Sequence, residues 1–311
     1  MKLSCKLELV TENQKYLEKL IVYGYYFSID VHCVKKRAQG MINMTDLEKF
    51  LFDLWGYVVI DDVLTQEEIV AANKATDHHT ELITNREPGL SQNSEKLKAE
   101  KGRGEFRQNP LTFDPPWCDP FRQMLTHPRI IDIFNEILGG GFRLDHGPGL
   151  IQMEQGTEGH WLHGGMTFDP SQYHRFEHGK MYCGLCVASW QLTDVLEGDG
   201  GFACIPGSHK SNYRPLSQML STENDLGTVK QISAKAGSVI VFNEALVHGT
   251  LSWKAENRMR RSILFKCSPG FLSWGRPSIE CPIADPTPEE LAVYESPHRT
   301  GRVTLEGQET S

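Results

Sequence analysis

Two histidines in this chain have neighbours that suit metal ligands. His163 follows an apolar pair and precedes two glycines, Gly164 and Gly165, while His248 follows an apolar run and precedes Gly249-Thr250. Mononuclear iron sites commonly use two imidazoles and one carboxylate on one face of Fe(II), which leaves the opposite positions for a cosubstrate and oxygen. The two histidines therefore indicate a candidate metal site, provided that the fold brings them together.

Composition narrows the class of protein. The chain has 311 residues, a net charge of −8 and no block of lysines or arginines, which argues against a nucleic-acid or anionic-membrane partner. No apolar run approaches the roughly 20 residues of a membrane helix, and no signal-peptide core follows Met1. The eight cysteines are scattered from Cys5 to Cys281, as expected for reduced thiols. We expect a cytoplasmic protein whose partner is a small molecule, with no indication of its oligomeric state.

The chain divides into three expected parts. Residues 1–40 lack a clean hydrophobic period and are interpreted as an appended segment of unknown role. Residues 41–280 are long enough for one domain with a large core, and residues 281–311 are expected to form a C-terminal tail.

Local signals in the domain predict a helix-strand-helix opening, with the short strand at residues 56–60, and a β-rich remainder. Capping-box patterns that begin at Thr45 and Thr65 predict two helices, and a third is expected over residues 128–138. Strands are expected at residues 149–153, 183–192, 201–205, 238–242 and 262–267. This order predicts an α+β fold with a double-stranded β-helix core, a cupin-like jelly roll, and flanking helices.

Two longer motifs carry a family resemblance. The run Trp190-Gln191-Leu192-Thr193-Asp194 and the later segment Gly198–Lys210, together with Phe52-Asp53-Leu54-Trp55-Gly56-Tyr57, resemble the phytanoyl-CoA dioxygenase-like family of Fe(II)/2-oxoglutarate-dependent oxygenases. The resemblance covers residues from about 45 to about 275. It implies an enzyme that hydroxylates a small-molecule substrate, with Fe(II) and 2-oxoglutarate as cofactor and cosubstrate.

The resemblance also implies roles for particular residues. His163 and His248 match the two histidines that hold iron, and Arg260, twelve residues after His248, matches the arginine that binds the far carboxylate of 2-oxoglutarate. A guanidinium suits that role because it offers two parallel donors to a carboxylate. Arg258 and Arg261 are alternative candidates for the same role. The remaining residues expected in the cosubstrate pocket are Thr250, Gln152 and Trp190.

One position departs from the family pattern. The family has His-X-Asp at the first histidine, but the residue two after His163 is Gly165. In one interpretation, a carboxylate from another position completes the iron site. The candidates are Asp169, Glu154, Glu158 and Glu244. Glu244 lies four residues before His248, a distance of roughly 13 Å along a strand, so it needs a bend or bulge to reach the metal.

Two further interpretations of Gly165 are open. Halogenases that use iron and 2-oxoglutarate carry Gly or Ala at this position, so a chloride ion would occupy the space in an enzyme of that kind. Alternatively, the metal site is degraded, and the jelly roll binds a small molecule or a partner without catalysis. We rank the oxygenase first, the halogenase second and the non-catalytic binder third.

Overall fold

The computed structural model describes residues 20–22, 25–27, 44–165, 169, 171–275 and 280–307. The chain separates into two compact units, residues 1–41 and residues 42–311. The described part of the first unit is an antiparallel pair of strands, β1 (Leu20–Val22) and β2 (Tyr25–Phe27). Most of the expected appended segment therefore lies outside the described residues, and its role stays open.

The second unit contains the other elements of the described residues. Its helices are α1 (Asp46–Trp55), α2 (Gln66–His78), α3 (Asp119–Leu125), α4 (Pro128–Leu138), α5 (Ser217–Leu220) and α6 (Pro288–Tyr294). Its early strands are β3 (Tyr57–Ile60), β4 (Ile83–Asn85), β5 (Gly104–Phe106), β6 (Arg143–Met153), β7 (His160–His163), β8 (His174–Glu177) and β9 (Lys180–Cys183). Its later strands are β10 (Cys186–Gln191), β11 (Gly201–Cys204), β12 (Lys230–Gln231), β13 (Val239–Asn243), β14 (His248–Leu251) and β15 (Arg260–Ser268).

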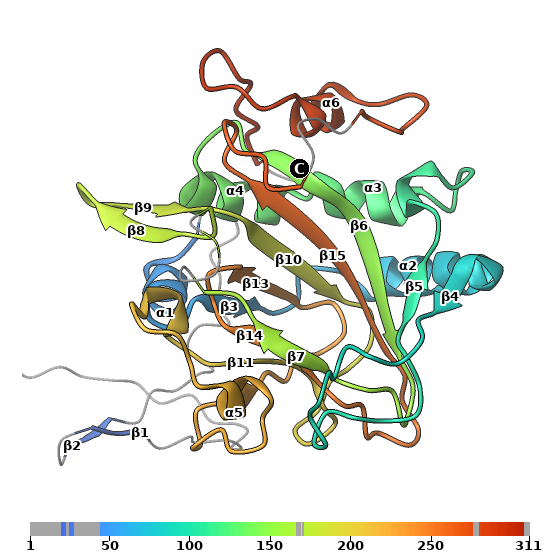
Figure 1. Ribbon diagram of the computed structural model, residues 1–311. Coiled ribbons are helices and arrows are strands. Elements are labelled where there is room, and N and C mark those ends of the chain that lie inside the picture. The colour runs from blue at the N-terminus through green and yellow to red at the C-terminus, as the bar shows by residue number, and fades with distance from the viewer. Residues whose placement is uncertain are drawn as a thin grey trace, which may run out of the picture. The chain divides into compact units, whose positions relative to one another are not determined.

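The strands of this unit form two main sheets. Among the described residues, the larger sheet has seven strands in the order β3-β13-β10-β15-β6-β5-β4, and the smaller has four in the order β12-β11-β14-β7. All pairings between these strands are antiparallel (Figure 1). The predicted α+β fold with a β-rich core and flanking helices is confirmed.

The two faces of the larger sheet bury different clusters. Successive side chains of a strand point to opposite faces, so Ala188 and Trp190 of β10 join a cluster with residues of α1 to α4. Val187 points to the other face, where it packs with Phe202 of β11 and Phe242 of β13. This second face is turned toward the smaller sheet. Polar side chains that point to the same face of the larger sheet as Val187 are therefore the ones that reach the interior between the two sheets.

The local signals read from the sequence correspond to observed elements. Thr45 and Thr65 form complete capping boxes at the first turns of α1 and α2. β6 is longer than the expected strand, and the expected strand 183–192 begins in β9 and continues as β10. Among the described residues, no helix is long and apolar enough to cross a membrane.

The described end of the chain packs onto the domain rather than trailing from it. A tail was expected from residue 281, but α6 contributes Val293 and Tyr294 to the main apolar cluster, and Leu305 joins them. Arg122 of α3 pairs with the buried Glu290 of α6 at 2.7 Å. Apolar spacing within one short helix was too weak a signal to show this packing.

Gly56 allows α1 to turn directly into β3. Its φ is +82°, and a Cβ at this position would lie 2.5 Å from Nδ1 of the buried His209 ring. Because a side chain would meet both backbone strain and overlap, we expect Gly56→Ala to lower the free energy of unfolding by about 2 to 4 kcal/mol in urea titrations.

Gly156 provides the matched control for this prediction. Its φ is +83°, but a Cβ there would meet nothing within 4 Å. Gly156→Ala should therefore show the backbone strain alone, about 1 to 2 kcal/mol. An equal loss in the two variants would show that overlap with His209 contributes nothing.

Candidate metal centre and cosubstrate pocket

The fold places His163 and His248 beside each other. β7 and β14 lie side by side (Figure 1). His163 is the last residue of β7, His248 is the first residue of β14, and the register of the two strands places these histidines opposite one another. The centroids of their rings lie 4.5 Å apart. Residues separated by 85 positions in the chain are thus brought together by the register of one strand pair.

Hydrogen bonds to the backbone leave both rings ready to bind a metal. Nδ1 of His163 lies 3.1 Å from the carbonyl oxygen of Trp161, and Nδ1 of His248 lies 2.7 Å from that of Leu246. A carbonyl oxygen can only accept, so each Nδ1 is the donor, and in the neutral form of either ring Nε2 is the nitrogen that presents a lone pair. Burial, followed by the nearby His163, lowers the pKa of His248 to about 4, so this ring is neutral at pH 7.

A carboxylate lies beside the two rings. One ligand atom from each of His163, Glu244 and His248 can be chosen so that all three lie within 4.8 Å of one another, and this is the one such group among the described residues. Oε2 of Glu244 is 3.8 Å from Nε2 of His248, and Oε1 is 2.7 Å from Nζ of Lys266. Although burial by itself raises the pKa of Glu244, Lys266 and His248 lower it to about 2.

The other carboxylates considered from the sequence are engaged elsewhere. Oδ2 of Asp169 accepts a hydrogen bond from the indole of Trp274 at 2.6 Å. Glu154 is exposed and pairs with Lys101 at 3.0 Å. The carboxylate of Glu158 accepts hydrogen bonds from three backbone N–H groups of a neighbouring loop. Glu244 is the candidate that the fold brings to the histidines.

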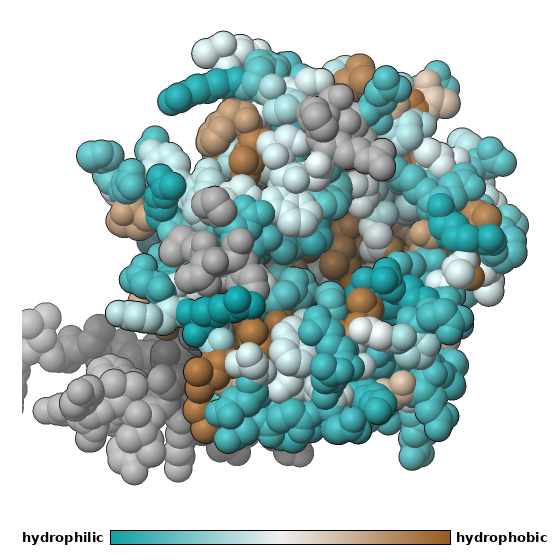
Figure 2. All heavy atoms as spheres, viewed as in Figure 1, coloured by the Kyte–Doolittle hydropathy of each residue, from teal (hydrophilic) through white to brown (hydrophobic). Residues whose placement is uncertain are grey.

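The three residues line a small cavity between the sheets. The cavity has a volume of about 140 Å³. Its walls are formed by Arg103, Ile151, His160, His163, Ser189, Phe202, Phe242, Glu244, His248, Gly249, Thr250, Arg260, Leu264 and Lys266. From the side shown in Figure 1, the surface is largely hydrophilic, with apolar atoms recessed near the middle of this face (Figure 2). Thr250, expected in the cosubstrate pocket, is among the lining residues.

The three arginines near the second histidine go to three different places. Arg258 pairs with Asp199 at 2.6 Å. Arg261 faces the helices, where it pairs with Asp77 at 2.7 Å. Arg260, one residue earlier on β15, points the opposite way and lines the cavity. The period of the strand therefore separates Arg260 from Arg261, while Arg258, before the strand begins, is held by its ion pair with Asp199.

Arg260 has an unusual environment for a charged side chain. It is 2% exposed, its Nη1 donates to the sulfur of Met153 at 3.3 Å, and its Nε has no hydrogen-bond partner. No ion pair joins it to a carboxylate of the described residues. Burial, followed by the charge of Arg103, lowers its pKa to about 10, so it remains protonated at pH 7. A buried, unpaired guanidinium is costly to the fold and is suited to receiving an anion.

A comparison with protein-family models agrees with this geometry. The model of phytanoyl-CoA dioxygenase matches residues 52–262, more than half of the chain. The chain belongs to the phytanoyl-CoA dioxygenase family. The predictions of the family and of an enzyme are thereby confirmed. A search of curated proteins found no match.

Several solved structures have a similar fold. HygX from Streptomyces hygroscopicus, solved with nickel and 2-oxoglutarate bound, is 22% identical, with a TM-score of 0.60 over 75% of this chain and 90% of its own. EctD from S. alaskensis, solved with 2-oxoglutarate and 5-hydroxyectoine, is 17% identical, with a TM-score of 0.55 over 86% of this chain and 89% of its own. SnoK from nogalamycin biosynthesis, described as a non-heme α-ketoglutarate-dependent carbocyclase, is 16% identical, with a TM-score of 0.55 over 86% and 95%. At these identities the likeness concerns the fold.

Two residues expected in the pocket of this family member lie elsewhere. Trp190 is fully buried among apolar side chains under the helices, on the opposite face of β10 from Ser189, which does line the cavity. Gln152 also faces outward, and its Oε1 accepts a hydrogen bond from Nε of Arg261 at 2.8 Å. Both expectations are corrected, because each residue has the wrong strand parity to reach the interior.

Two basic residues complete the cavity. Arg103, directly before β5, lies in the wall. Lys266 was missed, although it shares the parity of Arg260 on β15 and is six residues further along. The sequence signal that could have identified Lys266 was its spacing of an even number of residues from Arg260, which places both side chains on the same face of the strand. The register of β15 was needed to recognise it.

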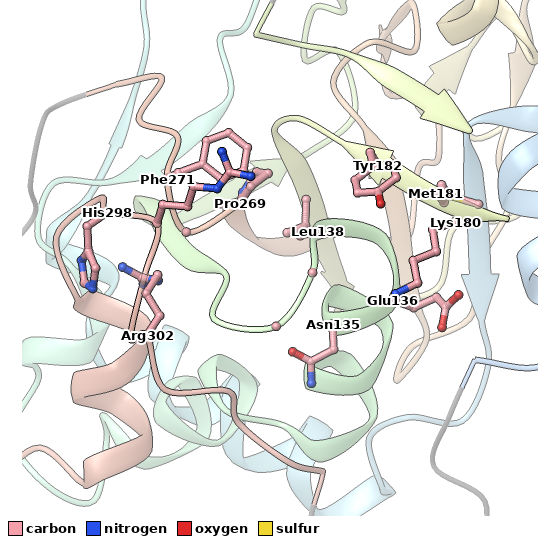
Figure 3. Close-up of a pocket in the computed structure, with 14 residues that line it drawn as sticks. Asn135, Glu136, Leu138, Lys180, Met181, Tyr182, Pro269, Phe271, His298 and Arg302 are labelled. Atoms are coloured by element: carbon pink, nitrogen blue, oxygen red, sulfur yellow. The ribbon is translucent and has the colours of Figure 1, made fainter. Parts of the chain in front are cut away.

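A larger cavity lies in another part of the same unit. Its volume is about 430 Å³, and its walls include Glu136, Lys180, Phe271 and Arg302 (Figure 3). Arg302 donates to backbone carbonyl oxygens there, including that of Ser296 at 2.8 Å. None of the three grouped ligand atoms lies in this cavity, so we assign the chemistry to the smaller one.

Proposed function

We propose that this chain is an Fe(II)- and 2-oxoglutarate-dependent oxygenase that hydroxylates a small molecule. Its site residues are proposed as His163 and His248 for the metal, with Arg260 and Thr250 for the cosubstrate. When bound, Fe(II) and 2-oxoglutarate supply the oxidising chemistry, and the protein contributes binding, orientation and a pocket shielded from water.

The observation that carries the proposal is that the guanidinium of Arg260, which has no carboxylate partner among the described residues, lines the same cavity as His163 and His248. A dicarboxylate that bridges a metal and a guanidinium would satisfy both ends of this arrangement. The hydroxyl of Thr250, on the cavity wall, can donate to the same carboxylate as Arg260. The residues therefore fit the metal and the cosubstrate that the family uses.

Hydroxylation, the reaction that we propose, is more specific than the class of enzyme. SnoK, described as an α-ketoglutarate-dependent carbocyclase, has a similar fold and a different reaction. A small-molecule substrate is supported by HygX, solved with hygromycin B, and by EctD, solved with 5-hydroxyectoine. We also propose a cytoplasmic location, on the basis of the composition of the chain.

The halogenase alternative is less favoured by the site. A halide would need a coordination position free of protein carboxylates, but Glu244 lies beside both histidines. The non-catalytic alternative is weakened by the intact pair of histidines and by the cost of keeping Arg260 buried without a partner.

Anaerobic titration with Fe(II) and 2-oxoglutarate tests the proposal. We expect a weak visible absorption band when both are present, unchanged by added chloride. Admission of oxygen should convert 2-oxoglutarate to succinate. A band that shifts with chloride would favour the halogenase, and the absence of both the band and succinate would overturn the proposed function.

A further inference from the structure

We propose that Glu244 is the third protein ligand of the metal and replaces the carboxylate that is missing at Gly165. This inference rests on the proposed function, because it concerns the metal that the oxygenase would hold. It places the family's carboxylate on a different strand connection: the ligand comes from the turn before the second histidine instead of the position two after the first.

A tight turn brings Glu244 to the histidines. β13 ends at Asn243, whose side-chain oxygen accepts from the backbone N–H of Ala245 at 2.7 Å. The carbonyl oxygen of Asn243 accepts from the N–H of Leu246 at 2.9 Å. The chain therefore reverses instead of continuing as a strand, and the four residues from Glu244 to His248 do not span the distance of extended backbone.

The glycine after His163 allows this turn to approach. Gly164 has a φ of +98°, and a Cβ there would lie 2.5 Å from the carbonyl oxygen of Leu246 and 2.7 Å from that of Glu244. A side chain at position 164 would therefore push the turn away. The His-Gly-Gly sequence and the turn at Glu244 therefore belong together. Gly165 lacks the carboxylate of the family pattern, and Gly164 leaves space for the turn that carries Glu244.

The charges of the cavity also favour this assignment. Among its described lining residues, Glu244 is the one carboxylate, whereas Arg103, Arg260 and Lys266 are cations. A dication held by two neutral imidazoles alone would face this positive wall without a protein anion nearby. Glu244 is 3% exposed and supplies the negative charge that a hard or borderline cation needs.

Lys266 has the position of a residue that orients the ligand. It pairs with Oε1 of Glu244, while Oε2 is the oxygen nearer to Nε2 of His248. One oxygen is thus held by the protein, and the other is directed toward the histidines. Ligating carboxylates are commonly fixed by such hydrogen bonds, and their loss weakens metal binding about 10- to 100-fold. Lys266 is therefore a positioning residue.

Calorimetric titration with Co(II) in the absence of 2-oxoglutarate provides the test. We expect Glu244→Gln, which keeps the shape but not the charge, to weaken Co(II) binding about 100-fold or more, and Lys266→Met to weaken it roughly 10-fold. Glu290→Gln is the matched control, since it also removes a buried carboxylate from an ion pair but does not line the cavity. This control should bind Co(II) like the wild type.

The possible results separate this inference from the proposed function. If wild-type protein binds Co(II) and Glu244→Gln binds it equally well, Glu244 is not a ligand while the two-histidine site stands. If wild-type protein binds neither Co(II) nor Fe(II), the proposed function itself fails.

A crystal structure of wild-type protein with Co(II) covers the case in which Glu244→Gln does not fold. We expect Oε2 of Glu244 at about 2.0 to 2.2 Å from the metal. A water molecule in that position, with the carboxylate displaced, would overturn the inference.

Discussion

Replacement of His248 or His163 by alanine is expected to weaken Fe(II) or Co(II) binding at least 100-fold. Each change removes one of a few ligands, and a ligand contributes about 3 kcal/mol or more to a site of this kind. In each ring Nδ1 is engaged with a backbone carbonyl oxygen, which fixes the ring with Nε2 as the nitrogen available to a metal, so the loss should be direct. Anaerobic titrations followed by calorimetry measure the effect.

His160→Ala is the matched control for this prediction. Its ring lies 4.5 Å from that of His163 and lines the same cavity, but it is outside the group of three ligand atoms. Burial, followed by His163 and Arg103, lowers the pKa of His160 to about 3, so it is neutral as well. A large loss of metal affinity in His160→Ala, with little loss in His163→Ala, would show that the first ligand is His160.

Replacement of Arg260 by methionine is expected to weaken 2-oxoglutarate binding about 100-fold or more. The change removes two charge-assisted hydrogen bonds, whose joint contribution is about 3 kcal/mol or more. Lysine at this position should recover only part of the affinity, because it keeps the charge and loses the planar fork. Titration of the metal-loaded protein with 2-oxoglutarate measures the dissociation constants.

Arg261→Met supplies the control, because its side chain lies on the opposite face of the same strand. It should bind 2-oxoglutarate normally. Without 2-oxoglutarate, Arg260→Met is expected to be at least as stable to urea as the wild type, since it removes a buried charge that has no carboxylate partner. Equal 2-oxoglutarate affinity in Arg260→Met and Arg261→Met would refute the cosubstrate role of Arg260.

The family and the class of fold could be predicted from sequence because they depend on local or contiguous signals. Capping boxes at Thr45 and Thr65 need only four residues each, and the motif at residues 198–210 is read without knowing its neighbours in space. The pairing of His163 with His248 was expected from resemblance alone. No local pattern shows which strands are adjacent, and β7 and β14 are too short to stand out.

The tertiary structure decided which side chains share the cavity. Strand parity separates Arg260 from Arg261 and places Trp190 and Gln152 outside, and parity follows from a register that extends across several strands. The sequence left four candidates for the carboxylate beside the histidines. The distance from Glu244 to His248 depends on a turn, which is formed by hydrogen bonds to Asn243 and by the close approach of Gly164. The sequence by itself indicated the candidate ligand types and the class of fold. Long-range pairing determined which of them meet, since only the folded chain sets the distances through which charges and ligands act.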